Sequence, residues 1–518
     1  MITVSATRRI PRSLLLACVV VAVIVGLPVI ITVIQAFQGG FSAASHALGD
    51  SSTPTLLEHT LELALLVTPV SGVLGVSAAW LVERTRVPGR RIWTLLLVAP
   101  LAVPLFVTSY AWATLSESLT GFWGAAGIVA FSYYPIVLLL VAASLRGMDP
   151  ALEETARSLG LGAWRTFWRV VMPQLKPALL GGMLLVLLDT LVEFDAFVAL
   201  KFQTLSVSIY SQYQLGFSGS GAAALALLST IACVIVLSGE SWLRGGTNYT
   251  RISQGARRGI VRYRLGRWMP VALIVLTAYV GFGLGIPVVR LIDWFTQGTS
   301  TAGAPAASSG VWSALLTTVL LGLSAALVSI LFALPISILA VRRSGRAVTL
   351  IERSIYLSFA LPDLVAAFAL AYGASHVAHF LYGTVVLVVL AEAMLFVPFA
   401  VVALRSTIAL IEPALEDSAR SLGLGPLRTL WRVTVPLARP GLAAAGVLVF
   451  AFVLGDLSTA QVLLPPGLTT LGTQFWADSG TVAFAAAAPY AAEMIVLALI
   501  ATYLLMGRFG RVRALAED

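Results

Sequence analysis

Long runs of apolar residues, separated by short polar segments, dominate this chain. A run of roughly 20 apolar residues is long enough to cross a lipid bilayer as a helix. The sequence contains twelve such runs, near residues 14–37, 57–82, 92–113, 124–145, 178–200, 222–243, 269–292, 311–341, 354–376, 383–404, 441–463 and 483–507. The pattern therefore predicts an all-α integral membrane protein with about twelve transmembrane helices.

Composition supports this class. Apolar residues make up 58% of the 518 residues and charged residues only 11%, which excludes an ordinary soluble protein. The first run is too long for the core of a cleavable signal peptide, so we interpret it as the first span. Cys18 and Cys233 both lie in apolar runs, which excludes a disulfide framework.

The basic residues predict an orientation. If the amino terminus is cytoplasmic, 31 of the 33 Lys and Arg residues fall on the cytoplasmic side, and only Lys201 and Arg290 fall outside. Cytoplasmic loops of membrane proteins are enriched in basic residues. We therefore expect both termini in the cytoplasm. The net charge of +9 then indicates orientation and contact with lipid headgroups, and no nucleic-acid partner.

One polar segment occurs twice. Residues 149–177 return as residues 412–440 without a gap, and 18 of the 29 positions are identical. The first copy predicts a helix that Asp149 caps and Pro150 begins; Glu412 and Pro413 offer a weaker start. We expect an apolar stripe of Leu152, Ala156 and Leu159, with Glu153, Glu154 and Arg157 on the opposite side.

A glycine turn and a second amphipathic helix follow. Gly160 and Gly162 interrupt the first helix. Apolar residues then recur at helical spacing, and Pro173 is expected to end the second helix. These apolar residues are Trp164, Phe167, Trp168, Val171 and Met172, with Leu427, Leu430, Trp431, Thr434 and Val435 in the copy. Interfacial helices lying on lipid are one interpretation. A docking surface for a symmetric partner better explains why the acidic pair and the glycine turn recur together in both copies.

The repeated segment resembles the EAA loop of ATP-binding-cassette (ABC) importer permeases. The matching residues are Glu154 to Gly160 with Val170 and Pro173, and Asp417 to Gly423 with Val433 and Pro436. Asp417, Thr155 and Ser418 are mild departures. The resemblance implies that both loops couple to an ATPase subunit. The coupling residues would be Glu153, Glu154, Ala156, Arg157 and Gly160, and Glu416, Asp417, Ala419, Arg420 and Gly423.

The loops also suggest how the chain is divided. Each lies between the fourth and fifth spans of a six-span half, so the halves would be parallel repeats. We expect a first permease half at 1–243, a basic cytoplasmic linker at 244–268 and a second half at 269–518. The linker has seven arginines and no acidic residue. We favour a plain tether against anionic lipid over a regulatory role.

Polar residues within spans are costly in lipid and often mark a pathway. The fifth span contains Asp189, Glu193 and Asp195, and its repeat counterpart contains Asp456, Ser458 and Gln461; Asp363 and Glu392 lie in the ninth and tenth. The resemblance puts the fifth and eleventh spans beside the translocation path. We expect Asp189 and Asp456 to line this path as oxygen ligands for a metal cation. Glu193 and Asp195 would lie at its outer mouth or in the outer interface.

The segments predicted to lie on the outer side of the membrane narrow the range of expected substrates. Residues 193–210 and the run Leu463-Leu464-Pro465-Pro466-Gly467 resemble those of ferric-iron permeases, although thiamine, polyamine and phosphonate permeases share much of this pattern. His376 and His379 are three residues apart and could bind a metal, but two nitrogen ligands favour an interfacial pair instead.

Three function classes were compared. A membrane enzyme lacks recognisable motifs, and Lys176 and Lys201 have no phosphate-loop context. An ion-coupled secondary transporter would not need the repeated loop. The resemblance implies an importer permease, without a cofactor of its own, in the bacterial cytoplasmic (inner) membrane. Its partners would be two copies of an ABC ATPase, which bind ATP and Mg, an extracytoplasmic substrate-binding protein and membrane lipid. Ferric iron is the expected substrate.

Overall fold

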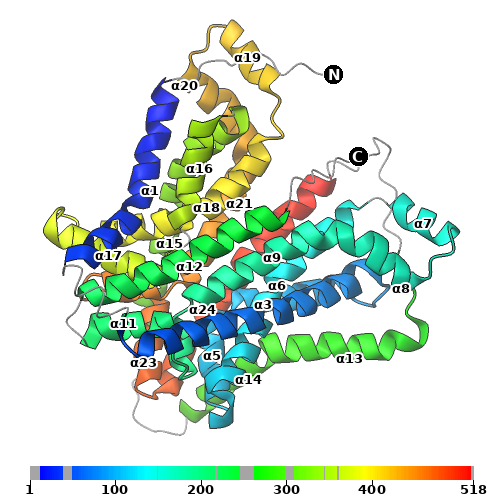
Figure 1. Ribbon diagram of the computed structural model, residues 1–518, viewed down its shortest axis with the longest axis horizontal. Helices are drawn as coiled ribbons and strands as arrows, with labels where there is room; N and C mark the ends of the chain where they lie inside the picture. Colours follow the sequence, from blue (N-terminus) through cyan, green and yellow to red (C-terminus); the bar gives the residue numbers. More distant parts are fainter. Residues whose placement is uncertain are drawn as a thin grey trace. The chain divides into compact units, whose positions relative to one another are not determined.

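The computed structural model describes residues 12–38, 49–148, 150–215, 219–244, 262–298, 308–343, 345–358 and 361–514 (Figure 1). Within these ranges all regular secondary structure is helical, and the only β pairing is an isolated bridge between Thr85 and Tyr263. The predicted all-α class is confirmed. The cap predicted for Asp149 lies outside the described residues.

Ten helices in the described part of the chain are long and apolar enough to cross a membrane. An eleventh candidate is a pair, Arg90–Ala102 and Leu105–Ala113, bent by 89°. The remaining predicted span, 354–376, corresponds to the two shorter helices Arg346–Ser358 (α16) and Asp363–His376 (α17). The count of twelve therefore stays a prediction.

The chain forms two compact units, and each is described by itself. Unit 2 comprises residues 41–304 and 482–495. Its helices are α3 (Ser52–Arg84), α4 (Arg90–Val98), η1 (Ala99–Ala102), α5 (Leu105–Ala113), η2 (Glu117–Leu119), α6 (Gly121–Gly147), α7 (Pro150–Ser158), α8 (Ala163–Thr166), η3 (Phe167–Val171), α9 (Met172–Val192), α10 (Asp195–Ala199), α11 (Leu205–Leu215), α12 (Gly219–Arg244), η4 (Gly266–Trp268), α13 (Met269–Val280), η5 (Gly281–Gly285) and α14 (Ile286–Gly298).

Unit 1 comprises residues 1–40, 305–481 and 496–518. Its helices are α1 (Arg12–Gln38), α15 (Ser308–Arg342), α16, α17, α18 (Val385–Ile408), α19 (Pro413–Ser421), α20 (Pro426–Thr429), η6 (Leu430–Thr434), α21 (Val435–Gly455), α22 (Ser458–Leu463) and α23 (Leu471–Gly480). The residues of α24 (Phe484–Ala514) are divided between the two units.

The units exchange the first helices of the two sequence halves. Helix α1 groups with the elements that follow residue 305, whereas α13 and α14 group with those that precede residue 244. This grouping describes spatial contacts and does not test the sequence boundaries at 243 and 268, which stay predictions.

Close backbone approach holds α1 in unit 1, where it lies beside α16 and α17 (Figure 1). The Ser358 hydroxyl donates to the Val25 carbonyl at 2.9 Å. A Cβ atom on Gly373 would lie 2.7 Å from Ile31 Cδ1, so a larger residue there would require the Ile31 side chain to move.

Aromatic packing holds α13 and η5 in unit 2. Phe282 stacks on Trp112 and on Phe131, with ring centroids 5.7 Å and 5.3 Å apart. The hydroxyls of Tyr279 and Ser77 lie 2.9 Å apart. Such contacts fix helix positions where hydrophobic burial cannot, because lipid is as apolar as the core.

Matching polar contacts occur in both units. The Thr60 hydroxyl accepts a hydrogen bond from the Leu205 amide at 2.9 Å. In unit 1 the Thr318 hydroxyl accepts one from the Leu471 amide at 2.9 Å. Each bond joins the first part of a long helix, α3 or α15, to the segment that follows the broken span of the same unit, so the structural repeat extends well beyond the two loops.

The fifth and eleventh spans are broken, and the prediction of continuous helices at 178–200 and 441–463 was wrong. Helix α9 ends at Val192 and α21 ends at Gly455, with short helices following. Glu193 Oε1 accepts the Ala196 amide at 3.0 Å, and Asp456 Oδ1 accepts the Thr459 amide at 3.2 Å. These carboxylates cap the next helix, a local bond that hydropathy does not reveal.

The prediction that Pro173 ends a helix was also wrong. A π-helical segment, η3, precedes this proline, and the helix continues into α9. A wider turn accommodates the proline ring and its missing N–H. Pro436 follows η6 in the same way. Consequently the residues at 164–192 and 426–455 form two long helices, each joining a repeated loop to a membrane span.

Candidate functional site

The two repeated loops have nearly identical turns. Gly160 and Gly423 have φ values of 83° and 85°, in the left-handed region that favours glycine. The Leu161 amide donates to the Ala156 carbonyl, and the Leu424 amide donates to the Ala419 carbonyl, each at 3.1 Å. These bonds close the helix ends in a Schellman arrangement. The predicted role of the first turn glycine is confirmed in both copies.

The predicted apolar stripe was wrong. Glu153 and Ala156 are buried on α7, whereas Leu152 and Leu159 are exposed, the latter by 78%. In α19 the buried residues are Glu416 and Ala419, and the exposed leucines are Leu415 and Leu422. The helices therefore turn a carboxylate inward and leucines outward. The reason is that each buried glutamate pairs with an arginine from another helix.

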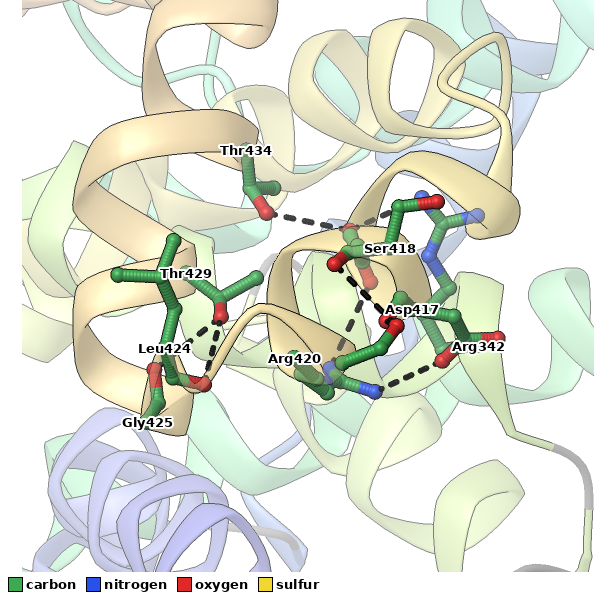
Figure 2. A network of polar contacts seen from close by, with 10 residues as sticks. Arg342, Asp417, Ser418, Arg420, Leu424, Gly425, Thr429 and Thr434 are labelled. Carbon is green, nitrogen blue, oxygen red and sulfur yellow. Dashed lines mark hydrogen bonds and ion pairs between the residues drawn. The ribbon is translucent and has the colours of Figure 1, made fainter.

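In the second loop, Glu416 is held by three side chains (Figure 2). Arg342 Nη2 and the Thr434 hydroxyl each donate to Glu416 Oε1 at 3.1 Å. Arg420 Nη2 lies 3.7 Å from Glu416 Oε2 and its Nη1 lies 3.3 Å from Asp417 Oδ1. All of these residues come from the second sequence half. A buried carboxylate with this many charge-assisted partners fixes the helix that carries it.

In the first loop, Glu153 has a different set of partners. Arg84 Nη2 lies 2.9 Å from Glu153 Oε1, and both side chains are almost fully buried. The Tyr263 hydroxyl donates to Glu153 Oε2 at 2.6 Å. Tyr263 belongs to the predicted basic linker, so a residue from outside the repeated segment completes this site.

Tyr263 makes further contacts with the same loop. The Arg157 guanidinium lies over its ring, 4.5 Å from the centroid, and the Trp80 ring stacks on it with centroids 6.1 Å apart. Its amide donates to the Arg84 carbonyl at 2.8 Å, and its carbonyl accepts the Arg86 amide at 3.0 Å. Burial and the hydrogen bond to Glu153 raise the pKa of Tyr263 to about 12, so the phenol stays neutral and able to donate.

Sequence reasoning missed Tyr263. It is one aromatic residue among many arginines, and the only available signal was its position shortly before α13. Its backbone pairing also shows that the linker is more than a plain tether over its last residues, 262–265. Linker residues 245–261 lie outside the described part of the chain.

The remaining predicted coupling residues lie at the surface of the loops. Glu154 and Arg157 are exposed, Asp417 is partly buried and Arg420 is exposed. Trp164 and Trp168 are also exposed, in T-shaped contact with centroids 5.6 Å apart. Thus each loop presents leucines and charged side chains outward around a fixed, buried carboxylate.

The predicted path residues of unit 2 lie close together. The Tyr133 hydroxyl donates to Glu193 Oε2 at 2.9 Å, and Tyr133 also interacts with Asp189. Asp195 is buried at the first position of α10. Tyr133, which sequence reasoning did not select, therefore connects two of the three predicted carboxylates of this unit.

In unit 1, Asp456 is half-buried and Ser458 is buried at the break after α21, whereas Gln461 is exposed. Glu392 is buried on α18 and interacts electrostatically with Asp456 and Asp363. The structure thus brings together the acidic residues of three predicted spans. Glu392 and Asp363 were noted as polar residues within spans, and their proximity to Asp456 could not be read from the sequence.

The metal prediction stays open. In the described residues no group of three His, Cys, Asp or Glu side chains is arranged to hold a metal ion. Asp189 belongs to unit 2 and Asp456 to unit 1, so the pairing of these two remains a prediction. The His376 ring stacks on Tyr372 with centroids 3.9 Å apart, and its Nδ1 lies 2.9 Å from the Tyr372 carbonyl. That histidine is thus engaged within its own helix.

The sequence matches the family described as binding-protein-dependent transport system inner membrane component, over residues 71–243 and 326–511. The chain belongs to this family. Each of the two matched segments contains one of the two repeated loops. Membership also shows that the protein is a multi-pass component of the inner membrane.

The relatives match different shares of this chain, from nearly all of it to less than half. The Fe(3+)-transport system permease protein FbpB 2 of Haemophilus influenzae is 32% identical over 505 residues, 96% of this chain and 98% of the relative. The ferric transport system permease protein FbpB of Actinobacillus pleuropneumoniae is 24% identical over 83% of this chain and 67% of its own length. The sulfate transport system permease protein CysT of Escherichia coli is 29% identical over 46% of this chain and 94% of its own length.

Proposed function

We propose that this chain is the permease subunit of an ABC importer for ferric iron. The observation that carries this proposal is the full-length similarity to a ferric-iron permease that is 32% identical over 96% of the chain. Sulfate permeases match only about half of the chain. The substrate would arrive on an extracytoplasmic binding protein, and both termini of the permease would lie in the cytoplasm.

Two copies of a cytoplasmic ABC ATPase would bind the loops around α7 and α19. The outward Leu159 and Leu422, exposed by 78% and 84%, supply apolar contacts that a groove on the ATPase could cover. Glu154 and Asp417 lie beside them and supply charge. The ATPases would hold ATP and Mg, and the permease would have no cofactor of its own.

Continuous helices support transmission of the ATPase movement. Each loop runs into a long helix, Trp164–Val192 or Pro426–Gly455, that ends at a capped break. A rigid helix displaced at its cytoplasmic end moves at its other end as well. Closure of the ATPases on ATP would therefore reach Glu193 and Asp456 and alternate the access of the path.

The acidic residues within the predicted spans favour a cation as the substrate. Asp189, Glu193 and Asp195 in one unit and Asp456 and Glu392 in the other would repel an oxyanion such as sulfate. Hard oxygen ligands suit a small, highly charged cation. Contact with iron would be transient, as passage through the protein requires.

Iron import by vesicles that contain the whole complex tests the proposal. We expect ATP-dependent accumulation of radioactive iron when the loaded binding protein is present. The variant with Glu154→Lys and Asp417→Lys should insert normally but hydrolyse ATP without importing iron, because Glu154 is exposed and Asp417 pairs with Arg420 where both side chains are nearly half exposed. Leu65→Ser, at an exposed position on α3 away from both loops, is the matched control and should transport normally.

Two results would reject the proposal in different ways. Parental vesicles that import sulfate or thiamine but no iron would overturn the substrate. Normal import by the Glu154→Lys, Asp417→Lys variant would overturn the assignment of the loops as the ATPase contact.

A further inference from the structure

The two loops differ at one buried position that faces the glutamate. Thr434 is the last residue of η6, and its hydroxyl donates to Glu416 at 3.1 Å. The equivalent last residue of η3 is Val171, which has nearly the same shape but no hydroxyl. Both side chains are almost fully buried. The first loop therefore lacks a hydrogen-bond donor that the second loop builds into its own helix.

Tyr263 supplies a hydroxyl to the loop that lacks one. Its donor oxygen lies 2.6 Å from Glu153 Oε2, and its ring is held between Arg157 and Trp80. The other oxygen, Glu153 Oε1, has the Arg84 ion pair but no hydrogen bond of good geometry. A buried carboxylate without enough donors is costly, so this phenol has a clear energetic role.

We propose that the segment Arg262–Leu265 is a working part of the first coupling loop, and that Tyr263 is a positioning residue that fixes α7 through Glu153. The segment lies immediately before η4 and α13. Consequently the first loop is mechanically connected to the helix that begins the second sequence half. The second loop is held by residues of its own half.

Because of this arrangement, displacement of the linker would affect the two loops differently. Displacement of the linker would loosen α7 by removing the Tyr263 hydroxyl, and it would leave the Thr434 bond to Glu416 intact. Displacement of the basic linker would therefore affect the ATPase contact of the first loop and not that of the second. For transport this inference rests on the proposed function, but the positioning role concerns the chain alone.

Hydrogen–deuterium exchange of the full chain in lipid nanodiscs tests the positioning role. Four variants are compared with the parent: Tyr263→Phe, Val171→Thr, the two combined, and Thr434→Val. Tyr263→Phe keeps the ring and its contacts with Arg157 and Trp80. Each variant contains an internal reference, because α7 and α19 are measured in the same molecule.

Loss of the phenol hydroxyl should make the α7 amides exchange about tenfold faster and leave α19 unchanged. Adding Val171→Thr should return the exchange of α7 to within about twofold of the parent, because the new hydroxyl occupies the position that Thr434 has in the second loop. Thr434→Val should accelerate α19 to a similar extent and spare α7.

Three results would overturn the inference. The first is unchanged exchange of α7 in Tyr263→Phe. The second is a double variant no better protected than Tyr263→Phe, since a hydroxyl at position 171 would then not replace the phenol. The third is unchanged exchange of α19 in Thr434→Val, which remains decisive if Tyr263→Phe cannot be purified.

A transport measurement separates this inference from the proposed function. In vesicles with the whole complex, Tyr263→Phe should lower the iron imported per ATP hydrolysed by about fivefold, and Val171→Thr should restore it. If the parental complex imports no iron, the proposed substrate fails while the exchange result stands. Normal iron coupling by Tyr263→Phe, together with faster exchange of α7, would overturn the coupling role of the segment.

Discussion

The two coupling loops share a backbone and differ in how they hold their buried glutamate. Both have the same glycine turn, the same outward leucines and a glutamate that pairs with an arginine from another helix. Glu416 takes its hydroxyl donor from Thr434 on the adjoining helix. Glu153 instead accepts a hydrogen bond from the hydroxyl of Tyr263, near the end of the linker. A repeated element can therefore keep its geometry while one contact moves to a distant part of the chain.

The difference shows which part of the site must be kept. The buried carboxylate needs a cation and a hydroxyl, whatever their source, because an unsatisfied charge in a dry site is costly. The element that supplies the hydroxyl is free to change. Where the donor comes from outside the repeat, the loop becomes sensitive to another region of the protein.

Removal of the buried glutamates should give the largest effect and should be unequal. In Glu153→Ala the Arg84 side chain, only 1% exposed, would be left buried without its partner, at a cost of about 3–5 kcal/mol of unfolding free energy. Glu416→Ala should cost less, because the Arg342 side chain is 15% exposed and can reach water. Chemical denaturation in detergent micelles measures both.

The double variant Arg84→Met with Glu153→Leu is the control for that comparison. Replacing both members of a buried ion pair with apolar residues is often close to neutral, so most of the loss should be recovered. If Glu153→Ala and Glu416→Ala lower stability equally, the degree of arginine burial does not set the cost.

The turn glycines should give a smaller and equal effect. Gly160→Ala and Gly423→Ala each force a side chain into positive φ, at a cost of about 1 kcal/mol. Nothing lies within 4 Å of a Cβ atom at either position, so backbone strain is the whole cost. A difference of more than about 0.5 kcal/mol between the two variants would show that the turns are not equivalent.

The outward leucines should hardly affect stability. Leu159→Ser and Leu422→Ser change exposed positions, where effects on unfolding free energy are usually within about 0.5 kcal/mol. If the ATPase covers them, each variant should nevertheless retain less ATPase during purification. Loss of stability beyond this range would indicate that the leucines serve the fold and not a partner.

The smallest effect concerns pH and should appear only in the first loop. A phenol whose folded pKa is raised contributes stability that is complete below its ordinary value near 10 and is lost as the pH rises through about 12. A spin label at Leu159→Cys, in a background without Cys18 and Cys233, should therefore keep its mobility from pH 7 to 9 and gain mobility between pH 10 and 12. The label at Leu422→Cys should not follow this course, and a change in both labels below pH 9 would contradict the assignment to Tyr263.

The sequence predicted the helical class, the loops and their turn glycines, since these follow from hydropathy and local backbone preferences. It failed at the inward face of α7 because the apolar spacing grouped Leu152 and Leu159 with Ala156, although only Ala156 of the three is buried. A buried pair between Glu153 and Arg84 reversed that face, and pairing between distant residues leaves no periodic signal. Tyr263 was missed for the same reason. The breaks at Glu193 and Asp456 depend on single capping bonds that hydropathy does not detect.

The exchange of first helices has a consequence for biosynthesis. Helix α1 leaves the ribosome first, but the elements with which it packs begin only at α15. Unit 2 in turn needs α13 and α14, and finally residues 482–495 near the end of the chain. Neither unit can be completed in the order of translation. Helix α1 therefore stays in lipid without its packing partners until α15 and the helices after it have been made. A chain cut within residues 245–261 would leave each fragment carrying a helix that the other requires. The two fragments should therefore accumulate only when they are produced in the same cell.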